Sequence, residues 1–291
     1  MDKVVWRLGY AQFHRDFRHQ ALTSLVKERF PRSRPAYLIA RVILEASAPK
    51  ERGTAEANTV PMSASDIYAR MCEFWDTDPQ LADVPKPSWP KIVQWLGALC
   101  NDLTGMLAKV PGGNSQDGHY VMNMGAMVQY MKSKLVKCTI NDRYGKESAR
   151  IFELLLQKKY LEQQHVGEMA MIPAKDARER LYNMLLDRLV AMQEVPKRAD
   201  RNPSTTFYLW TVRHDQVDHV HLENLYKAML NMRLRRKFIY DREKELFLHD
   251  AAARLSDDTE RERLDKVRRN LDQLDHSLLR LDKNLMHFNT F

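Results

Sequence analysis

Apolar residues recur with helical spacing from residue 146 to residue 186, near the middle of the chain. Over 146–159 they return every three or four residues, which predicts an amphipathic helix. A short second helix is expected over 162–170. Pro173 then begins a third helix, because proline fits the first helical turn, where its missing N–H leaves no hydrogen bond unmade.

The spacing changes after the third helix. Two runs rich in β-branched, aromatic and other apolar residues, 190–195 and 206–212, predict strands. The polar turn between them contains Pro196 and Pro203, which end regular structure there. Three helices followed by two strands around a polar loop are the pattern of a winged helix, which we expect over 145–215.

A second, less regular copy of this pattern is expected over 35–140. Segment 47–61 has no periodicity and is rich in Ala, Glu, Pro and Thr, so we expect a mobile insertion there. Trp89 and Trp95 lie on a short helix and are expected in the core rather than as base-stacking platforms. The expected elements are helices over 35–46, about 65–74 and 89–100 (with Ile92, Val93, Leu96 and Leu99 inward), strands over 106–110 and 119–124, and a linking helix over 126–140.

Residues 1–34 are expected to hold the last strand of an upstream winged helix and a linking helix. The alternating segment 3–8 predicts a strand without a nearby partner, which leaves its backbone unpaired. We expect it to close a module that precedes this stretch, or to pair with another subunit. In the helix over 10–30 we expect Phe13, Phe17, Leu22, Leu25 and Val26 to be buried, and Arg15, Arg18, Lys27 and Arg29 to be exposed.

Residues 216–291 are expected to be almost entirely helical, since 216–255 and 257–291 contain neither proline nor glycine. Apolar residues of the second segment alternate spacings of three and four, which is a heptad seam. The short break at 256–258 favours an antiparallel coiled-coil hairpin, while a homodimeric coil through the same seam is the alternative. The seam consists of Leu264, Val267, Leu271, Leu274, Leu278, Leu281, Leu285 and Phe288. The predicted fold class is thus mostly α with small β-wings: tandem winged helices followed by a helical hairpin.

Composition adds limits rather than detail. The 291 residues carry a formal net charge of +8, a modest basic excess that favours polyanion partners. The three cysteines show no CxxC spacing, which favours a reducing compartment and argues against a zinc ribbon. No apolar run is long enough to predict a transmembrane helix, and the first residues do not read as a signal peptide.

Three groups of side chains are candidate contacts with nucleic acid or with a protein partner. The third helix of the 145–215 module carries Lys175, Arg178 and Tyr182 on the face away from its core. Acidic residues lie among its cations, which disfavours base reading in the major groove and favours packing on another protein. The turn between the strands suits phosphate contact, and a basic cluster follows on the next helix; a solvated surface is the alternative for both. These cations are Lys197, Arg198 and Arg201 in the turn, and Arg233, Arg235, Arg236 and Lys237 in the cluster.

No catalytic or metal-binding pattern is visible. The sequence lacks HExxH, CxxC, GxSxG and P-loop motifs, and its ten histidines are scattered. We therefore expect no enzymatic activity on this chain, and no metal, cofactor or small-molecule substrate.

Three segments carry a family resemblance: MIPAK at the third helix, QEVP at the end of the first strand and TFYLWTV in the second. With LYKAMLNMRLRRKF downstream, they resemble the C-terminal part of the third RPC subunit of DNA-directed RNA polymerase III. That subunit is the largest of the polymerase III-specific heterotrimer, in the TFIIE-alpha-like winged-helix family. Weaker similarity reaches upstream to VVWRLGYAQFHRDFRHQ, so the resemblance covers most of the chain and about the second half of that family.

The resemblance implies a non-catalytic, structural and initiation role in the transcription of tRNA and other short RNAs in the nucleus. It implies docking on the clamp of the largest catalytic subunit, and contact with two heterotrimer partners and a TFIIIB-type initiation factor. It also implies help in binding and opening promoter DNA. The family's partner-binding residues are not carried over individually.

Two other functions fit the predicted fold. A free-standing, TFIIE-like winged-helix transcription factor would bind duplex DNA alone, with a steep salt dependence. The near-neutral third helix argues against it. A winged-helix scaffold of another complex, such as a proteasome-lid-like assembly, fits the composition, but the MIPAK and TFYLWTV segments count against it.

Overall fold

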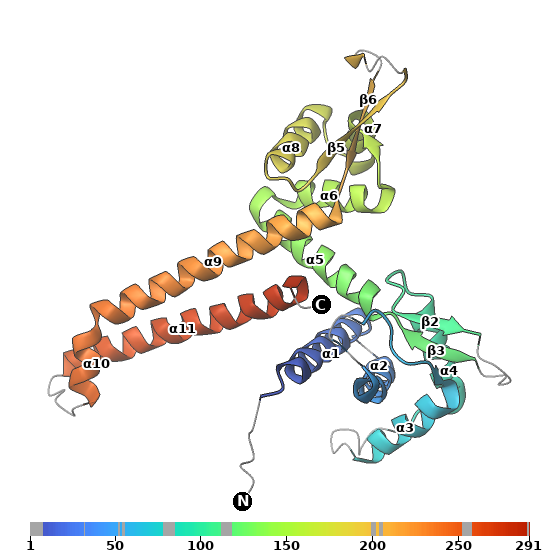
Figure 1. The fold of residues 1–291 in the computed structure, drawn as a ribbon, viewed down its shortest axis with the longest axis horizontal. Coiled ribbons are helices and arrows are strands. Elements are labelled where there is room, and N and C mark those ends of the chain that lie inside the picture. Colours follow the sequence, from blue (N-terminus) through green and yellow to red (C-terminus); the bar gives the residue numbers. More distant parts are fainter. Residues whose placement is uncertain are drawn as a thin grey trace, which may run out of the picture. The chain divides into compact units, whose positions relative to one another are not determined.

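The computed structural model describes residues 8–31, 33–51, 53, 56–77, 85–111, 118–198, 202–203, 206–251, 258–289 and 291. The chain divides into two compact units, residues 1–133 with 290–291, and residues 134–289. Each unit contains several helices and one small antiparallel sheet (Figure 1). This confirms the predicted fold class of mostly helical, tandem winged-helix architecture. The domain boundaries that we expected stay predictions.

The first unit is a winged helix with an additional N-terminal helix. Its sheet has the order β1-β3-β2, and Met62 pairs with Tyr120 while Leu107 pairs with Met122. β1 was not expected, because two residues are too few to show the alternation of a strand. The elements are α1 (Tyr10–Arg29), α2 (Arg34–Ser47), the 3-10 turn η1 (Ala48–Lys50), β1 (Met62–Ser63), α3 (Ala64–Thr77), α4 (Trp89–Cys100), β2 (Leu107–Val110), β3 (His119–Met122) and the start of α5 (Met124–Tyr144).

The core of the first unit lies between α2, α3, α4 and the sheet. The hydroxyl of Ser33 accepts a hydrogen bond from the Ala36 N–H at 3.2 Å, which caps α2. Trp89 and Trp95 pack against this core, as expected. Val93, which we expected to face inward, is 41% exposed. The fully buried side chains include Ile39, Ile43, Ile67, Met71, Ile92, Leu96, Leu99 and Met122.

Helix α1 packs on α2 with part of the face that we predicted. Leu22, Leu25 and Val26 are buried, but Phe13 and Phe17 are 53% and 36% exposed. Arg18, which we expected in solvent, is only 1% exposed. The reason is a partner far along the chain: Arg18 Nη2 lies 2.7 Å from the buried carboxylate of Glu51.

The segment after α2 is held to the sheet in its described residues. The Met122 N–H donates to the Thr59 hydroxyl at 2.8 Å, and the Val60 N–H donates to the Ser47 hydroxyl at 2.8 Å. These hydrogen bonds fix Thr59 and Val60 in the fold, and the mobile insertion that we expected over 47–61 stays a prediction. Residues 3–7 of the predicted N-terminal strand lie outside the described residues, as do residues 112–117 between β2 and β3.

The second unit contains the other winged helix, with Trp210 at its centre. Trp210 is 1% exposed and packs with Phe152, Leu155, Val166 and Leu181. The sheet order is β4-β6-β5, and β4 was again too short to be expected. The elements are the end of α5, α6 (Lys146–Lys158), β4 (Leu161–Glu162), α7 (Gln163–Ala170), α8 (Ala174–Leu186), β5 (Ala191–Pro196), β6 (Thr206–Thr211), α9 (His214–Arg242), α10 (Lys244–Ala251) and α11 (Asp258–Asn289).

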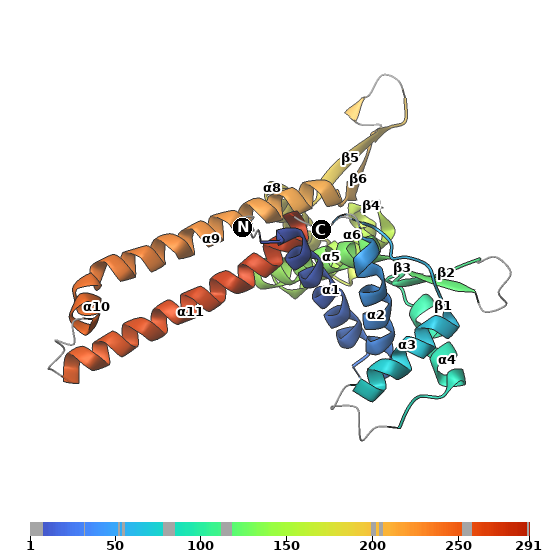
Figure 2. The ribbon, with the colours of Figure 1, turned by 60° about the horizontal axis from the view of Figure 1, so that its bottom comes forward.

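Helices α9 and α11 lie side by side in antiparallel directions, as Figures 1 and 2 show. The expected uninterrupted helix over 216–255 is wrong at Glu243, where α9 ends and α10 follows. Coiled-coil packing of α9 against α11, with knobs-into-holes contacts, stays a prediction. The homodimeric coil through the same seam stays its alternative. None of the helices in the described ranges combines the length and apolarity needed to cross a membrane.

Candidate partner and nucleic-acid interface

The face of α8 that we selected is exposed. Ala177, Leu181 and Met184 turn into the core, which leaves Lys175 and Arg178 on the solvent side. Over the part of the chain that the structure describes, neither cation has an ion-pair partner. Tyr182 is 46% exposed, and its ring meets Trp210 edge-to-face with centroids 5.5 Å apart. This face thus offers two cations beside one anchored aromatic ring.

The wing formed by β5 and β6 presents both charge and apolar surface. Val195 pairs with Phe207 across the strands, and the two are 41% and 40% exposed. Lys197 Nζ lies 4.4 Å from the centroid of the Phe207 ring, a cation–π contact. Arg198 is exposed, and Arg201 lies outside the described residues. The contact with Phe207 therefore holds the Lys197 ammonium group in place on the wing.

The basic cluster of α9 is exposed along its whole length. Arg236 forms an ion pair, because its Nε lies 2.7 Å from the carboxylate of Asp275 on α11. Among the described residues, Arg233, Arg235 and Lys237 have no ion-pair partner. Arg236 therefore ties α9 to α11, and the other three cations are available to a partner.

The predicted seam is buried at one end and half-buried at the other. Leu264, Val267 and Leu271 are buried against the hairpin. Leu274, Leu278, Leu281, Leu285 and Phe288 are half-buried. On α9, Leu225 is buried and the ring of His221 lies 4.8 Å from that of Phe288. Burial lowers the pKa of His221 below its ordinary value, so this contact uses the neutral imidazole.

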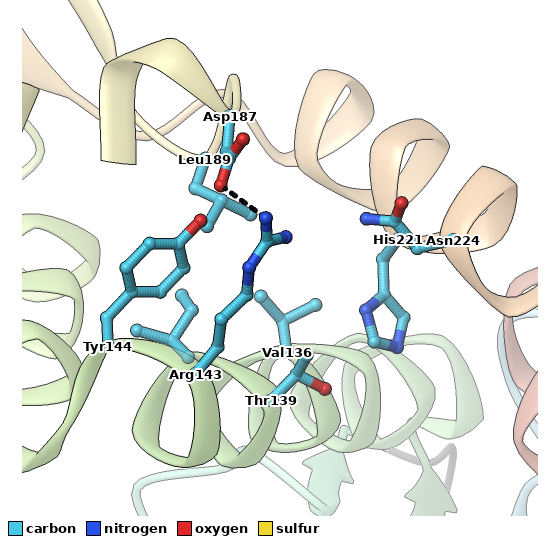
Figure 3. Close-up of a pocket in the computed structure, with 9 residues that line it drawn as sticks. Val136, Thr139, Arg143, Tyr144, Asp187, Leu189, His221 and Asn224 are labelled. Atoms are coloured by element: carbon cyan, nitrogen blue, oxygen red, sulfur yellow. Dashed lines mark ion pairs between the residues drawn. The ribbon is translucent and has the colours of Figure 1, made fainter. Parts of the chain in front are cut away.

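A small pocket lies where α5, the α8–β5 connection and α9 meet (Figure 3). Figure 3 shows Arg143 reaching from α5 to Asp187, with an Nη2–Oδ2 distance of 3.1 Å. His221 points from α9 toward α5 in the same view. The cavity measures about 20 Å³, room for about one water molecule. The cavity is a small void in the packing of these elements and is too small for a substrate.

Two buried carboxylates, Glu51 and Glu243, form ion pairs at positions outside the helices and strands. Burial alone would raise the pKa of Glu51, but hydrogen bonds and charges of His19 and Arg18 outweigh it, so the pKa lies below its usual value. At the α9–α10 junction, the hydrogen bond from Arg263 (2.7 Å) lowers the pKa of Glu243, and Arg242 adds to this. Both are structural ion clusters rather than reactive groups.

Metal-binding and redox chemistry find little support among the described side chains. No group of three or more His, Cys, Asp or Glu residues is placed there to hold a metal ion. The three cysteines are free; Cys72 and Cys100 are half-buried and Cys138 is exposed.

One exposed feature of the second unit was not predicted from the sequence. Tyr226, Leu230, Leu234 and Phe238 follow one another at intervals of four on α9 and are 47–63% exposed. In the sequence, these four residues form an apolar repeat with a spacing of four, and this repeat could have revealed the feature. Arg18 and Glu51 were also missed, since they lie far apart in sequence and are joined only by the fold.

Comparison with known proteins identifies the relatives of this fold. Residues 136–212 match the family described as "POLR3C, C-terminal winged-helix domain". Over 237 residues the chain is 34% identical to DNA-directed RNA polymerase III subunit RPC3 of Rattus norvegicus, covering 81% of this chain and 42% of the relative. The human subunit of the same name is 33% identical over the same coverage. The subunit rpc3 of Dictyostelium discoideum is 26% identical, covering 81% of this chain and 35% of the relative.

The similarity extends beyond the matched winged helix, since 81% of the chain aligns with the mammalian relatives. The chain spans 42% of the length of those relatives. The part that matches carries the family's C-terminal winged helix. Residues 136–212 therefore carry the C-terminal winged helix of the POLR3C family, and most of the chain is similar to part of the RPC3 subunits.

Proposed function

We propose that this chain serves as the C-terminal part of a non-catalytic subunit of nuclear RNA polymerase III. The observation that carries the proposal is the 34% identity to the rat RPC3 subunit over 81% of the chain. In this role it docks on the clamp of the largest subunit, contacts two smaller heterotrimer partners and a TFIIIB-type initiation factor, and helps to bind and open promoter DNA. Catalytic carboxylates and Mg²⁺ belong to another subunit.

The surface of α8 supports a scaffold role more than a sequence-reading role. Lys175 and Arg178 are exposed but alternate with Asp176 and Glu179 on the same helix. Acidic side chains repel the phosphates that a recognition helix must approach. Because charges of both signs lie beside the half-exposed Tyr182, we assign this face to a protein partner.

The wing supports a contribution to DNA binding that does not depend on sequence. Arg198 is exposed, and the cation–π contact with Phe207 orients Lys197. Phosphate contacts of this kind add affinity, and each weakens with salt because binding releases counterions. The wing is thus assigned to the DNA backbone, and no base contact is proposed.

The test is purification of the tagged full-length protein from its own cells at moderate salt, followed by mass spectrometry. We expect the large polymerase III subunits and two small polymerase III-specific partners at equal stoichiometry. The variant Lys175→Glu with Arg178→Glu should reduce their recovery several-fold. Reversal of Lys266 and Arg269, two exposed cations on α11, is the matched control and should have no effect.

Two results would contradict the proposal. Recovery of the chain alone with duplex DNA would favour a free-standing winged-helix transcription factor. Recovery with the subunits of another assembly would favour a scaffold in that assembly.

A further inference from the structure

Helix α9 has two apolar faces, and α11 covers only one of them. Leu225 is buried, Met229 and Met232 are half-buried, and Arg236 reaches Asp275 on α11. These residues follow spacings of three and four, so they share the side that faces α11. Figures 1 and 2 show α11 running along one side of α9.

The second apolar face consists of Tyr226, Leu230, Leu234 and Phe238, here called the outer stripe. Residues four apart lie above one another on a helix. Leu234 comes two residues after Met232, and two residues turn a helix by about 200°. The outer stripe therefore lies opposite α11, and its members are 47%, 57%, 56% and 63% exposed. Four large apolar side chains in a row are more than the scattered exposed residues expected on a soluble protein surface.

Charge around the outer stripe is of one sign. From Tyr226 to Phe238 the chain has five basic residues and no acidic residue. One of them, Arg236, is paired with α11. Arg233 lies three positions from Leu230 and Lys237 lies three positions from Leu234, so both cations border the stripe directly. Glu223 and Asp241 lie only beyond its ends.

We propose that the outer stripe is a docking site for an acidic amphipathic helix of another protein. A helix with apolar residues at intervals of three and four would cover Leu230 and Leu234, while its flanking carboxylates would meet Arg233 and Lys237. The inference rests on the proposed function, in which the chain is part of a larger protein assembly, and it specifies the chemistry of one partner in that assembly.

Other occupants fit the same surface less well. A second copy of this chain would set the cations of one stripe against those of the other, which repel. Nucleic acid would satisfy Arg233 and Lys237, but its phosphates offer nothing to four apolar side chains. A neutral or basic helix would leave the cations unpaired or opposed. Charge and apolarity together therefore select an acidic helix.

Site-specific photocrosslinking tests this in the assembled protein. A photoreactive phenylalanine analogue replaces Leu234 in the full-length chain expressed in its own cells, and crosslinked peptides are sequenced by mass spectrometry. The matched control places the analogue at Leu279 on α11, which is 61% exposed outside the stripe. We expect Leu234 to crosslink to one peptide with apolar residues every three or four positions and net negative charge.

A binding measurement gives a second readout. The probe is a fluorescent 18-residue synthetic peptide with leucine at heptad positions and glutamate at the flanking ones; a second peptide has lysine in place of glutamate. The glutamate peptide should bind the full chain, and Leu230→Asp with Leu234→Asp should weaken binding about tenfold or more, as for a central interface residue. Leu279→Asp should change binding less than twofold.

The outcomes separate this inference from the proposed function. Crosslinking to an acidic amphipathic segment supports the docking site even if polymerase III subunits do not co-purify. Crosslinking to DNA, to a second copy of this chain or to a basic peptide overturns it, as does a yield at Leu234 no greater than at Leu279. Equal binding of the two synthetic peptides also overturns it, even if polymerase III subunits are recovered.

Discussion

The buried ion pair between Arg18 and Glu51 gives the sharpest prediction for the first unit. The two side chains are 2% and 1% exposed, and their atoms lie 2.7 Å apart. Glu51 also accepts from His19 at 3.0 Å, while Arg18 donates to the Glu56 carbonyl at 3.3 Å. Glu51→Gln keeps the shape of the side chain but removes its charge, which leaves the Arg18 guanidinium buried and uncompensated.

The expected cost follows from that burial. Removing one partner of a buried pair destabilises a protein by about 3–5 kcal/mol, because desolvation of the remaining charge is no longer repaid. Replacing both partners, with Arg18→Met and Glu51→Met, should cost far less than Glu51→Gln for the same reason. The matched control is Glu45→Gln, which breaks an exposed pair with Arg41 and should cost about 0.5 kcal/mol or less.

The assay is urea unfolding combined with hydrogen exchange in α1 and in residues 47–61. Glu51→Gln should lower the free energy of unfolding and accelerate exchange in both segments. The pKa of Glu51 is lowered on folding from 4.5, so this stabilisation is present above about pH 4.5 and is lost as the pH falls through the lower folded value. A loss for Glu51→Gln no larger than for Glu45→Gln would refute the reasoning.

Three further predictions concern the second unit. Trp210→Ala should cost about 3–5 kcal/mol in urea unfolding, because the side chain is 1% exposed, whereas Tyr208→Ala on the 39% exposed wing should cost much less; equal costs would contradict the assigned core. The pKa of His221 is lowered on folding from 6.5, so stability should fall as the pH drops through 6.5 and His221→Leu should flatten that dependence, as measured by unfolding at pH 5.5 and 7.5. Glu243→Gln should speed hydrogen exchange at the α9–α10 junction by removing the carboxylate that Arg263 binds at 2.7 Å, and unchanged exchange there would count against that role.

Much of the architecture was predictable because the winged helices repeat strong local patterns. The spacing of Ile151, Phe152 and Leu155 defined α6, and the β-branched and aromatic run in β6 placed its strand. β1 and β4 were missed, since a two-residue strand shows no alternation and exists only through pairing with β3 and β6.

The candidate surfaces were predictable only in part. Exposure of Lys175 and Arg178 followed from the helix period, because Ala177 and Leu181 fixed the opposite face as core. Burial of Arg18 did not follow, because its partner Glu51 is 33 positions away in a segment without periodicity. Pairing of Arg236 with Asp275 also required the fold, and it divides the basic cluster into one structural and three available cations.

The most direct test of the central claim is the rate of synthesis of new RNA after rapid depletion of this protein in its own cells. Nascent transcripts are labelled within minutes of depletion, so that indirect effects stay small. We expect precursor tRNA synthesis to fall severalfold while messenger RNA synthesis is unchanged. Equal loss of both classes, or unchanged tRNA synthesis, would contradict a role as a polymerase III subunit.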